Sequence, residues 1–458
     1  MLKERTIMSA ISSAKDEMIS PDEMEANAGG DYNAKRIAGV YREYQKTLKA
    51  NNALDFDDLI FKTVELLNRD EEVLEAYQER FRYIMVDEYQ DTNTSQFRLI
   101  SKLAQKYGNL CVVGDDDQSI YKFRGANIGN ILGFEHVFPD ARVIRLEQNY
   151  RSTRNILNAA NQVIANNTER KAKTLWTENE EGSKVHFRQF LNAYEEAEYV
   201  AGEIGKLKRN GLGNYRDCAI LYRTNAQSRV FEEALRKRGM PYKIYGGLSF
   251  YQRKEIKDII AYFRLVVNPN DEEAFKRIIN YPARGIGDTT VGKIITAATD
   301  NNVSLWTALC EPITYGLSIN KGTHTKLQDF RALIEQFMAD VTVKNAYEIG
   351  TEIIRQSGII NEVCQDNSPE NLSRKENIEE LVNGMNDFCA MRQEEGNTNV
   401  SLIDFLSEVS LLTDQDSDKE GDGEKVTLMT VHSAKGLEFR NVFVVGMEEN
   451  LFPSGMAG

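Results

Sequence analysis

The chain has 458 residues, of which 41% are hydrophobic and 28% charged, as expected for a globular protein of about two to four domains. Its formal net charge of −14 disfavours a protein that coats nucleic acid with a basic surface, although a local basic track remains compatible. Five scattered cysteines without a CxxC pair and no apolar run near the roughly 20 residues of a membrane span indicate a reducing, cytoplasmic location.

Residues 34–107 are predicted to be mostly helical, because apolar residues recur there at three- and four-residue spacing. Short apolar runs separated by helix-length segments predict buried strands of a parallel sheet wrapped by helices. These runs are residues 83–86, 110–113, 143–146, 218–222 and 242–245. The fold class expected is therefore α/β.

After Gly246 and Gly247 the strand runs stop, and residues 251–412 read almost entirely as helix. An acidic segment at residues 414–425 is expected to be a flexible linker, and strand runs resume at 426–431 and 441–445. The pattern predicts that a helical domain interrupts the α/β domain, which is rejoined after it.

The first chemical signal is the pair Asp87 and Glu88, which directly follows an apolar strand run. This arrangement is typical of the Walker B element of a nucleotide hydrolase. The first acid can hold a phosphate-bound Mg²⁺ and the second can position an attacking water. Asp87 is thus the predicted metal ligand, and a polar turn is the structural alternative.

The second signal follows the strand run at 110–113, where the chain reads GDDDQSIYKFRGA. Gln118 can hydrogen-bond a γ-phosphate or its attacking water, while Tyr121 and Phe123 can stack on the bases of a single strand. A solvated acidic loop with two core aromatics is the structural alternative.

The third signal is the stretch RLEQNYRS, which contains Tyr150 and Arg151. Arginine suits the charge that develops on a transferring phosphate, because its guanidinium fork is planar and permanently ionised. Arg151 is therefore a candidate arginine finger, and Tyr150 offers a face for an adenine ring.

The fourth signal is TVHSAKGLEF, again after a strand run. His432 and Ser433 are expected to contact a DNA backbone, since Gly436 permits close approach of the main chain. Glu438 can accept a hydrogen bond from a ribose hydroxyl or bridge toward the nucleotide.

Two further patterns are interpreted as decoys. Residues 287–294 fit GxxxxGK but end in Ile294, which has no hydroxyl for magnesium, and they follow a proline-containing turn. The acids of residues 414–418 begin like a calcium loop, but Lys419 occupies the position that requires glycine. A metal-dependent nuclease using Asp115, Asp116 and Asp117 is a third function class, disfavoured by the lack of a catalytic lysine or histidine constellation.

Seven strings in order resemble the motifs of UvrD/PcrA/Rep-type superfamily 1A DNA helicases, closest to the PcrA branch. They are VDEYQDTN, VVGDDDQSIYKFRGAN, IRLEQNYRS, ILYRTNAQSR, YGGLSFYQRKEIKD, RGIGDTT and TVHSAKGLEF. The resemblance covers essentially the whole chain. It implies RecA-like motor domains around an ATP cleft, helical insertions, and 3′ to 5′ movement along single-stranded DNA.

The resemblance also implies roles for individual residues. Asp87 would lie on the magnesium side, Glu88 would be the catalytic base, Gln118 the γ-phosphate sensor and Arg151 the finger, with Tyr150 on adenine. The residues implied to line the single-strand track are Tyr121, Phe123, Arg124, Asn225 and His432.

Position 123 is commonly tryptophan in such helicases, so Phe123 keeps a stacking face of smaller area and function is expected to persist. The turn Gly285-Ile286-Gly287 resembles the family's contact with duplex backbone, where a glycine-flanked turn before a helix offers amide donors to phosphate.

The implied domain organisation has four parts. Residues 1–60 would be a remnant of the helical 1B insertion, 61–142 a partial motor domain 1A, 143–247 with 421–458 motor domain 2A, and 248–420 the helical insertion 2B. The implied cofactors are ATP and Mg²⁺. The implied partners are single-stranded DNA, single-strand/double-strand junctions, and repair or replication proteins of a bacterial cytoplasm.

Neither a Walker A loop nor the family's final arginine motif is found in the sequence, so we expect a fragment of a helicase. The competing hypothesis is a non-catalytic DNA-binding or interaction module derived from a helicase.

We predict that the 458-residue polypeptide alone releases little or no phosphate from ATP, because no Walker A amides and lysine cradle the β- and γ-phosphates. A colorimetric phosphate-release assay with single-stranded DNA present measures this. Robust turnover that Glu88→Gln abolishes would show the prediction to be wrong.

Overall fold

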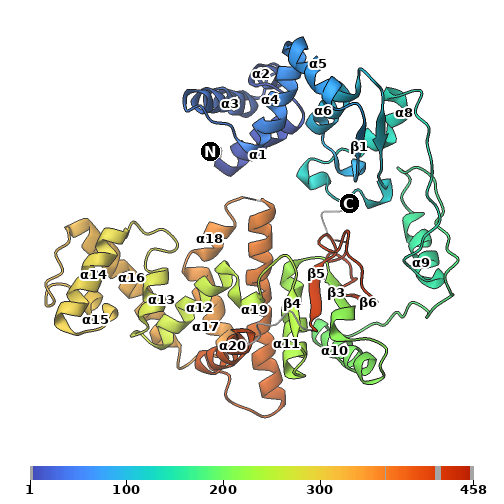
Figure 1. Ribbon diagram of the computed structural model, residues 1–458. Coiled ribbons are helices and arrows are strands. Elements are labelled where there is room, and N and C mark those ends of the chain that lie inside the picture. The colour runs from blue at the N-terminus through green and yellow to red at the C-terminus, as the bar shows by residue number, and fades with distance from the viewer. Residues whose placement is uncertain (1–3, 367, 418–423, 454–458) are drawn as a thin grey trace. The chain divides into compact units, whose positions relative to one another are not determined.

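The computed structural model describes residues 4–366, 368–417 and 424–453 (Figure 1). The chain divides into two compact units, Met1–Arg188 and Gln189–Gly458. Within the described ranges, every helix is too short or too polar to cross a lipid bilayer. The domain boundaries expected from the sequence stay a prediction.

The described part of the first unit opens with five α-helices, and those from α3 onward confirm the helical character predicted for residues 34–107. They are α1 (Glu4–Asp16), α2 (Pro21–Asn27), α3 (Tyr32–Ala50), α4 (Phe56–Arg69) and α5 (Glu71–Arg80). Acidic side chains cap three of them, because the Asp31, Asp55 and Asp70 carboxylates each accept a backbone N–H of the first turn.

A buried cation fastens α1 to the start of α4. The side chain of Lys15 is fully buried, and its Nζ lies 2.6 Å from Asp55 Oδ2 and 3.0 Å from Asp58 Oδ1. The same two aspartates form the capping box of α4. The start of α4 and its packing against α1 therefore depend on one ion cluster.

The sheet of the first unit has two parallel strands, β1 (Ile84–Val86) and β2 (Leu110–Val112), joined through α6 (Thr94–Ala104). Ile84 lies opposite Leu110, so both strands end at the same edge. The expectation of buried strands is wrong here: Met85 is 83% exposed, because two strands alone cannot cover both faces of their ribbon.

The prediction of a strand at residues 143–146 is also wrong. These residues belong to no strand, and Val143, Ile144 and Leu146 are 49%, 70% and 78% exposed, so no sheet buries them. The short helices α7 (Gly129–Leu132) and α8 (Phe134–Val137) precede them, and α9 (Arg154–Ile164) follows. A single parallel bridge joins Gln148 to Trp176.

The second unit contains a four-stranded parallel sheet in the order β4-β5-β3-β6. Its strands are β3 (Cys218–Tyr222), β4 (Tyr242–Ile244), β5 (Val426–Thr430) and β6 (Asn441–Val444), and its core includes residues of α10 (Ala193–Arg209) and α11 (Ser228–Lys237). β5 lies between β4 and β3, although nine α-helices of the described residues separate it from β4 in sequence. The predicted interruption and rejoining of the sheet is confirmed.

Those nine helices share one large apolar core. They are α12 (Lys254–Val267), α13 (Glu272–Ile278), α14 (Asp288–Asn301), α15 (Leu305–Cys310), α16 (Lys321–Asp340), α17 (Ala346–Gln356), α18 (Ile359–Val363), α19 (Pro369–Glu394) and α20 (Leu402–Ser417). The buried guanidinium of Arg229 on α11 binds Glu380 at 2.8 Å and Asp387 at 3.2 Å, both on α19. This network ties the helical part to the sheet.

The prediction that residues 414–425 form a flexible linker is partly wrong. Helix α20 continues through Ser417, so the first four residues of that segment are helical. Residues 418–423 lie outside the described part of the chain.

We predict that Lys15→Met destabilises the first unit by about 3–5 kcal/mol, because it leaves the buried carboxylate of Asp58 beside Asp55 without a cation. Urea unfolding followed by circular dichroism measures the change. The matched control is Lys46→Met on α3, which removes only an exposed pair with Glu43 and should cost about 0–1 kcal/mol. Equal losses in both variants would contradict the role of the buried cluster.

Candidate functional site

The two acids predicted as a Walker B pair lie where β1 ends. Asp87 and Glu88 are both exposed, and Asp87 Oδ1 accepts the backbone N–H of Glu88 at 2.9 Å. Glu88 has φ 50° and ψ 41°, a left-handed conformation that costs on the order of 1–3 kcal/mol for a residue with a side chain. The backbone thus turns sharply at the acidic pair, which fits a functional position.

Gln90 connects the ends of the two strands, a role that the sequence did not reveal. Its side chain is fully buried; Nε2 donates to Glu88 Oε2 at 2.6 Å, and Oε1 accepts the backbone N–H of Asp115 at 3.0 Å. A Cβ on Gly114 would lie 2.6 Å from Gln90 Oε1, so glycine is needed for this close approach. One buried amide therefore orients the second acid and fixes the loop after β2.

Gln118, the predicted sensor, lies on that loop in the 3₁₀ turn Asp116–Gln118. Its Nε2 donates to Asp115 Oδ2 at 2.7 Å. Asp115 thus receives a hydrogen bond from Gln118 through its side chain and donates one to Gln90 through its backbone. Glu88 and Gln118 consequently belong to one hydrogen-bonded chain of residues.

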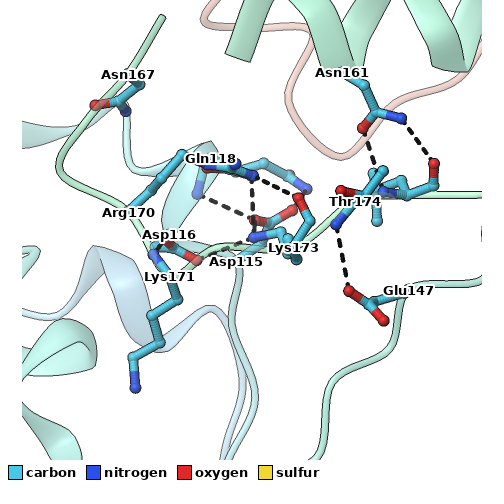
Figure 2. A network of polar contacts seen from close by, with 12 residues as sticks. Asp115, Asp116, Gln118, Glu147, Asn161, Asn167, Arg170, Lys171, Lys173 and Thr174 are labelled. Carbon is cyan, nitrogen blue, oxygen red and sulfur yellow. Dashed lines mark hydrogen bonds and ion pairs between the residues drawn. The ribbon is translucent and has the colours of Figure 1, made fainter. Parts of the chain in front are cut away.

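The three consecutive aspartates before Gln118 surround an ammonium group. Lys173 Nζ lies 2.6 Å from Asp115 Oδ1 and 3.0 Å from Asp116 Oδ1 (Figure 2). It also lies 3.1 Å from Asp117 Oδ2. Burial works against its charge, but hydrogen bonds to Asp115 and Asp116 raise the pKa of Lys173. The ammonium occupies the position that a metal ion would need, which disfavours the metal-dependent nuclease.

Arg170 adds a second cation to the same cluster. Its Nε and one terminal nitrogen bind the two carboxylate oxygens of Asp117 at 2.7 and 2.6 Å. Hydrogen bonds from Arg170 and then from Lys173 lower the pKa of Asp117. Neither Lys173 nor Arg170 was singled out from the sequence, because a pairing across more than fifty residues leaves no local pattern.

The aromatic residues predicted to stack on bases gather on the same loop. The ring centroids of Tyr121 and Phe123 lie 6.1 Å apart, and the Arg124 guanidinium carbon lies 5.3 and 5.5 Å from them. Phe123 is 58% exposed. The structure therefore places a cationic and aromatic surface within six residues of Gln118.

Tyr150 and Arg151 lie in a turn held by two asparagines. Asn149 Oδ1 accepts the backbone N–H of Arg151 at 3.1 Å and of Ser152 at 2.9 Å. Asn179 Nδ2 donates to the backbone oxygens of Tyr150 and Ser152 at 3.1 and 3.0 Å. Tyr150 is 77% exposed. The approach of Arg151 to the acidic pair stays a prediction.

In the second unit, the ends of β3 and β5 meet because Tyr222 lies opposite Thr430. The His432 Nδ1 consequently lies 3.5 Å from a terminal nitrogen of Arg223. Ser433 Oγ lies 2.9 Å from Thr430 Oγ1, which closes the turn after β5. Arg223 was missed as a site residue, although it lies in the motif ILYRTNAQSR.

The remaining residues predicted for this edge of the second unit are Gly436, Glu438 and Asn225. Gly436 has φ 84°, and Glu438 is exposed. Asn225 is one of ten residues that line a pocket of about 340 Å³, and the charged residues among them are Arg253, Lys254, Arg374, Glu255 and Glu370. The pocket therefore carries three cationic and two acidic side chains.

The turn predicted to meet duplex backbone precedes α14. Gly285 has φ 72°, and Gly287 is the N-cap residue of that helix. Ile286 is buried, and its backbone N–H donates to Asn280 Oδ1 at 3.1 Å. Ile286 therefore anchors the turn, and contact of Gly285 and Gly287 with DNA stays a prediction.

Two family models match the chain in succession. The UvrD/REP helicase N-terminal domain matches residues 1–139, and the UvrD-like helicase C-terminal domain matches residues 144–457. Together they cover the acidic pair, the sensor loop, Arg151 and the turn after β5.

Curated relatives show the same similarity. The ATP-dependent DNA helicase PcrA of Staphylococcus aureus strain Mu50 is 49% identical over 453 residues, and that of Staphylococcus epidermidis is 48% identical over 452. Each alignment covers 98% of this chain and 60% of the relative. The chain thus spans about 60% of the length of the relatives it matches.

Proposed function

Because the chain belongs to the UvrD-like helicase family, we propose that it forms part of an ATP-driven motor that moves 3′ to 5′ along single-stranded DNA. The observation that carries this proposal is the hydrogen-bonded path from Glu88 through Gln90 and Asp115 to Gln118. It joins an acid suited to water activation and an amide suited to sensing phosphate at adjacent ends of parallel strands. Ligands of α/β proteins bind at such ends.

The residues present fit a magnesium–nucleotide complex. Mg²⁺ prefers oxygen ligands and is usually held by one or two carboxylates together with substrate phosphates, and Asp87 is an exposed carboxylate at a strand end. Bound magnesium would neutralise charge on the phosphates. Arg151 would stabilise the charge of the transferring phosphate, and Tyr150 presents an exposed ring for adenine.

Glu88 is the proposed base. Gln90 Nε2 holds one of its oxygens, so the carboxylate orientation is set before any water arrives. Preorganised polar groups of this kind need no rearrangement at the moment of reaction, which is the usual source of their catalytic effect. Gln118 would complete the site from the neighbouring strand end.

The proposed DNA track begins on the sensor loop itself. Tyr121 and Phe123 offer ring faces for bases, and Arg124 supplies a cation beside both rings. Arg223, Asn225, His432 and Ser433 would contact the backbone from the second unit. Because Tyr121 follows Gln118 by three residues, a change at the nucleotide can reach the stacking surface through one short loop.

The proposed substrates and setting follow the family. We assign the chain to single-strand/double-strand junctions, with the Gly285–Gly287 turn toward the duplex, in the repair or replication of DNA in a bacterial cytoplasm. ATP and Mg²⁺ are its proposed cofactors.

We predict that the chain binds a fluorescent ATP analogue weakly and only with Mg²⁺, and that Arg151→Ala lowers this affinity roughly tenfold through loss of charge-assisted hydrogen bonds. A fluorescence titration measures the affinity. Arg142→Ala, which removes another exposed arginine of the first unit nine residues earlier, is the matched control and should have little effect. Equal affinity in the Arg151→Ala variant and the unaltered chain would favour the non-catalytic DNA-binding module instead.

We also predict that Phe123→Ala weakens single-strand binding by roughly 1–3 kcal/mol, the contribution of one base stacked on an aromatic ring. Titration of a labelled oligonucleotide measures the loss. Phe56 on α4 is 90% exposed, so Phe56→Ala removes a similar ring outside the proposed track and should leave affinity unchanged. Unchanged binding after Phe123→Ala would remove this residue from the track.

A further inference from the structure

Residues 170–182 form an irregular segment that contacts both parts of the proposed nucleotide site within the first unit. One end binds the loop that carries Gln118, and the other end binds the turn that carries Arg151. The seven family-like sequence strings lie outside this segment, and its contacts are long-range in sequence.

The contacts at the first end are ionic and largely shielded. Lys173 binds all three aspartates of the loop that carries Gln118, and Arg170 binds Asp117 through two nitrogens. The side chains of Lys173 and Arg170 are only 15% and 14% exposed, and that of Asp116 is 5% exposed. Shielded, multiply bonded ion pairs resist screening better than surface pairs.

A single carboxylate, that of Asp115, connects Lys173 to Gln118. Asp115 Oδ1 binds Lys173 Nζ at 2.6 Å, while Asp115 Oδ2 accepts from Gln118 Nε2 at 2.7 Å. Without the ammonium, Asp115, Asp116 and Asp117 would repel one another, because like charges at this separation destabilise a shared site. Lys173 therefore fixes the carboxylate that in turn fixes Gln118.

The contacts at the second end run along the Arg151 turn. The backbone N–H of Asn149 donates to Trp176 O at 2.7 Å, and the backbone N–H of Trp176 donates to Glu147 O at 2.9 Å. Thr174 adds a backbone N–H to Glu147 Oε1 at 3.3 Å (Figure 2). Three residues beyond Trp176, Asn179 Nδ2 binds the backbone oxygens on both sides of Arg151.

The two ends are close together along the chain. Lys173 and Asn179 are six residues apart, so at most about 20 Å of extended backbone separates them. The segment is short enough to limit how far the sensor loop and the Arg151 turn can move apart.

We propose that residues 170–182 hold Gln118 and Arg151 in a fixed mutual position, with Lys173 and Asn179 as positioning residues for phosphoryl transfer. The inference rests on the proposed function for the roles of Gln118 and Arg151. The mechanical link itself is a property of the unliganded chain. Small displacements of catalytic groups are costly in such reactions, because positioning supplies much of their rate.

Hydrogen exchange read by mass spectrometry, on the full 458-residue chain without nucleotide, tests the link. Lys173→Met should speed exchange roughly tenfold both at residues 115–118, where the ion pairs are lost, and at 148–152, where Lys173 makes none of its ion pairs. Lys173→Arg should restore slow exchange at both, because it returns a cation able to bind two carboxylates.

Lys171→Met is the matched control. Among the residues that the structure describes, the Lys171 ammonium pairs with Glu135, and the contact of Lys171 with Asp116 uses its backbone N–H, which the substitution keeps. This variant loses the same charge two residues away and should leave exchange at 148–152 unchanged.

Two outcomes would overturn the proposal. One is faster exchange in Lys173→Met at 115–118 alone, which would make the ion cluster a local tie. The other, which holds even if Lys173→Met fails to fold, is Asn179→Ala exchanging faster at 150–152 but not at 115–118. Neither result depends on nucleotide, so failure of the link is distinguishable from failure of the motor function, which the Arg151→Ala titration reports.

Discussion

The ammonium group of Lys173 among Asp115, Asp116 and Asp117 is the interaction on which the rest of the nucleotide site depends. Three adjacent carboxylates, one of them buried, would destabilise their own loop without a cation at their centre. With the cation present, Asp115 can orient Gln118 through its side chain and meet Gln90 through its backbone. The three carboxylates of the loop, held by Lys173, thus help to fix the position of Gln118.

A second constraint is the parallel pairing of strands in both units. Parallel strands bring their carboxyl ends to one edge, so residues far apart in sequence meet there. In the first unit this edge gathers Glu88 and Asp115, and in the second it gathers Arg223 and His432.

The sequence predicted well the features that depend on residues close to one another in the chain. The strand ends carrying Asp87 and Gln118, the parallel sheet around β3 and the helical interruption before β5 all followed from periodicity and motif order. Burial was harder to predict: an apolar run such as residues 143–146 indicates a strand only if a neighbouring strand pairs with it, and these side chains are exposed.

The unpredicted part of the site consists of long-range partners. Gln90 lies inside a motif, but its buried bridge to Asp115 depends on the close approach at Gly114. Lys173 and Asn179 carry no local signal, because the partners of Lys173 are 56 to 58 residues away and those of Asn179 are 27 or 29 residues away. Pairings of that kind depend on how the chain folds back, which spacing alone does not encode.

The most direct measurement is a double-mutant cycle that combines Lys173→Met with Asp115→Asn and reads hydrogen exchange at residues 115–118. The account predicts strong non-additivity, with the double variant exchanging little faster than either single variant, because both substitutions remove the same ion pair. Fully additive effects would show that Lys173 and Asp115 act independently and would contradict the account.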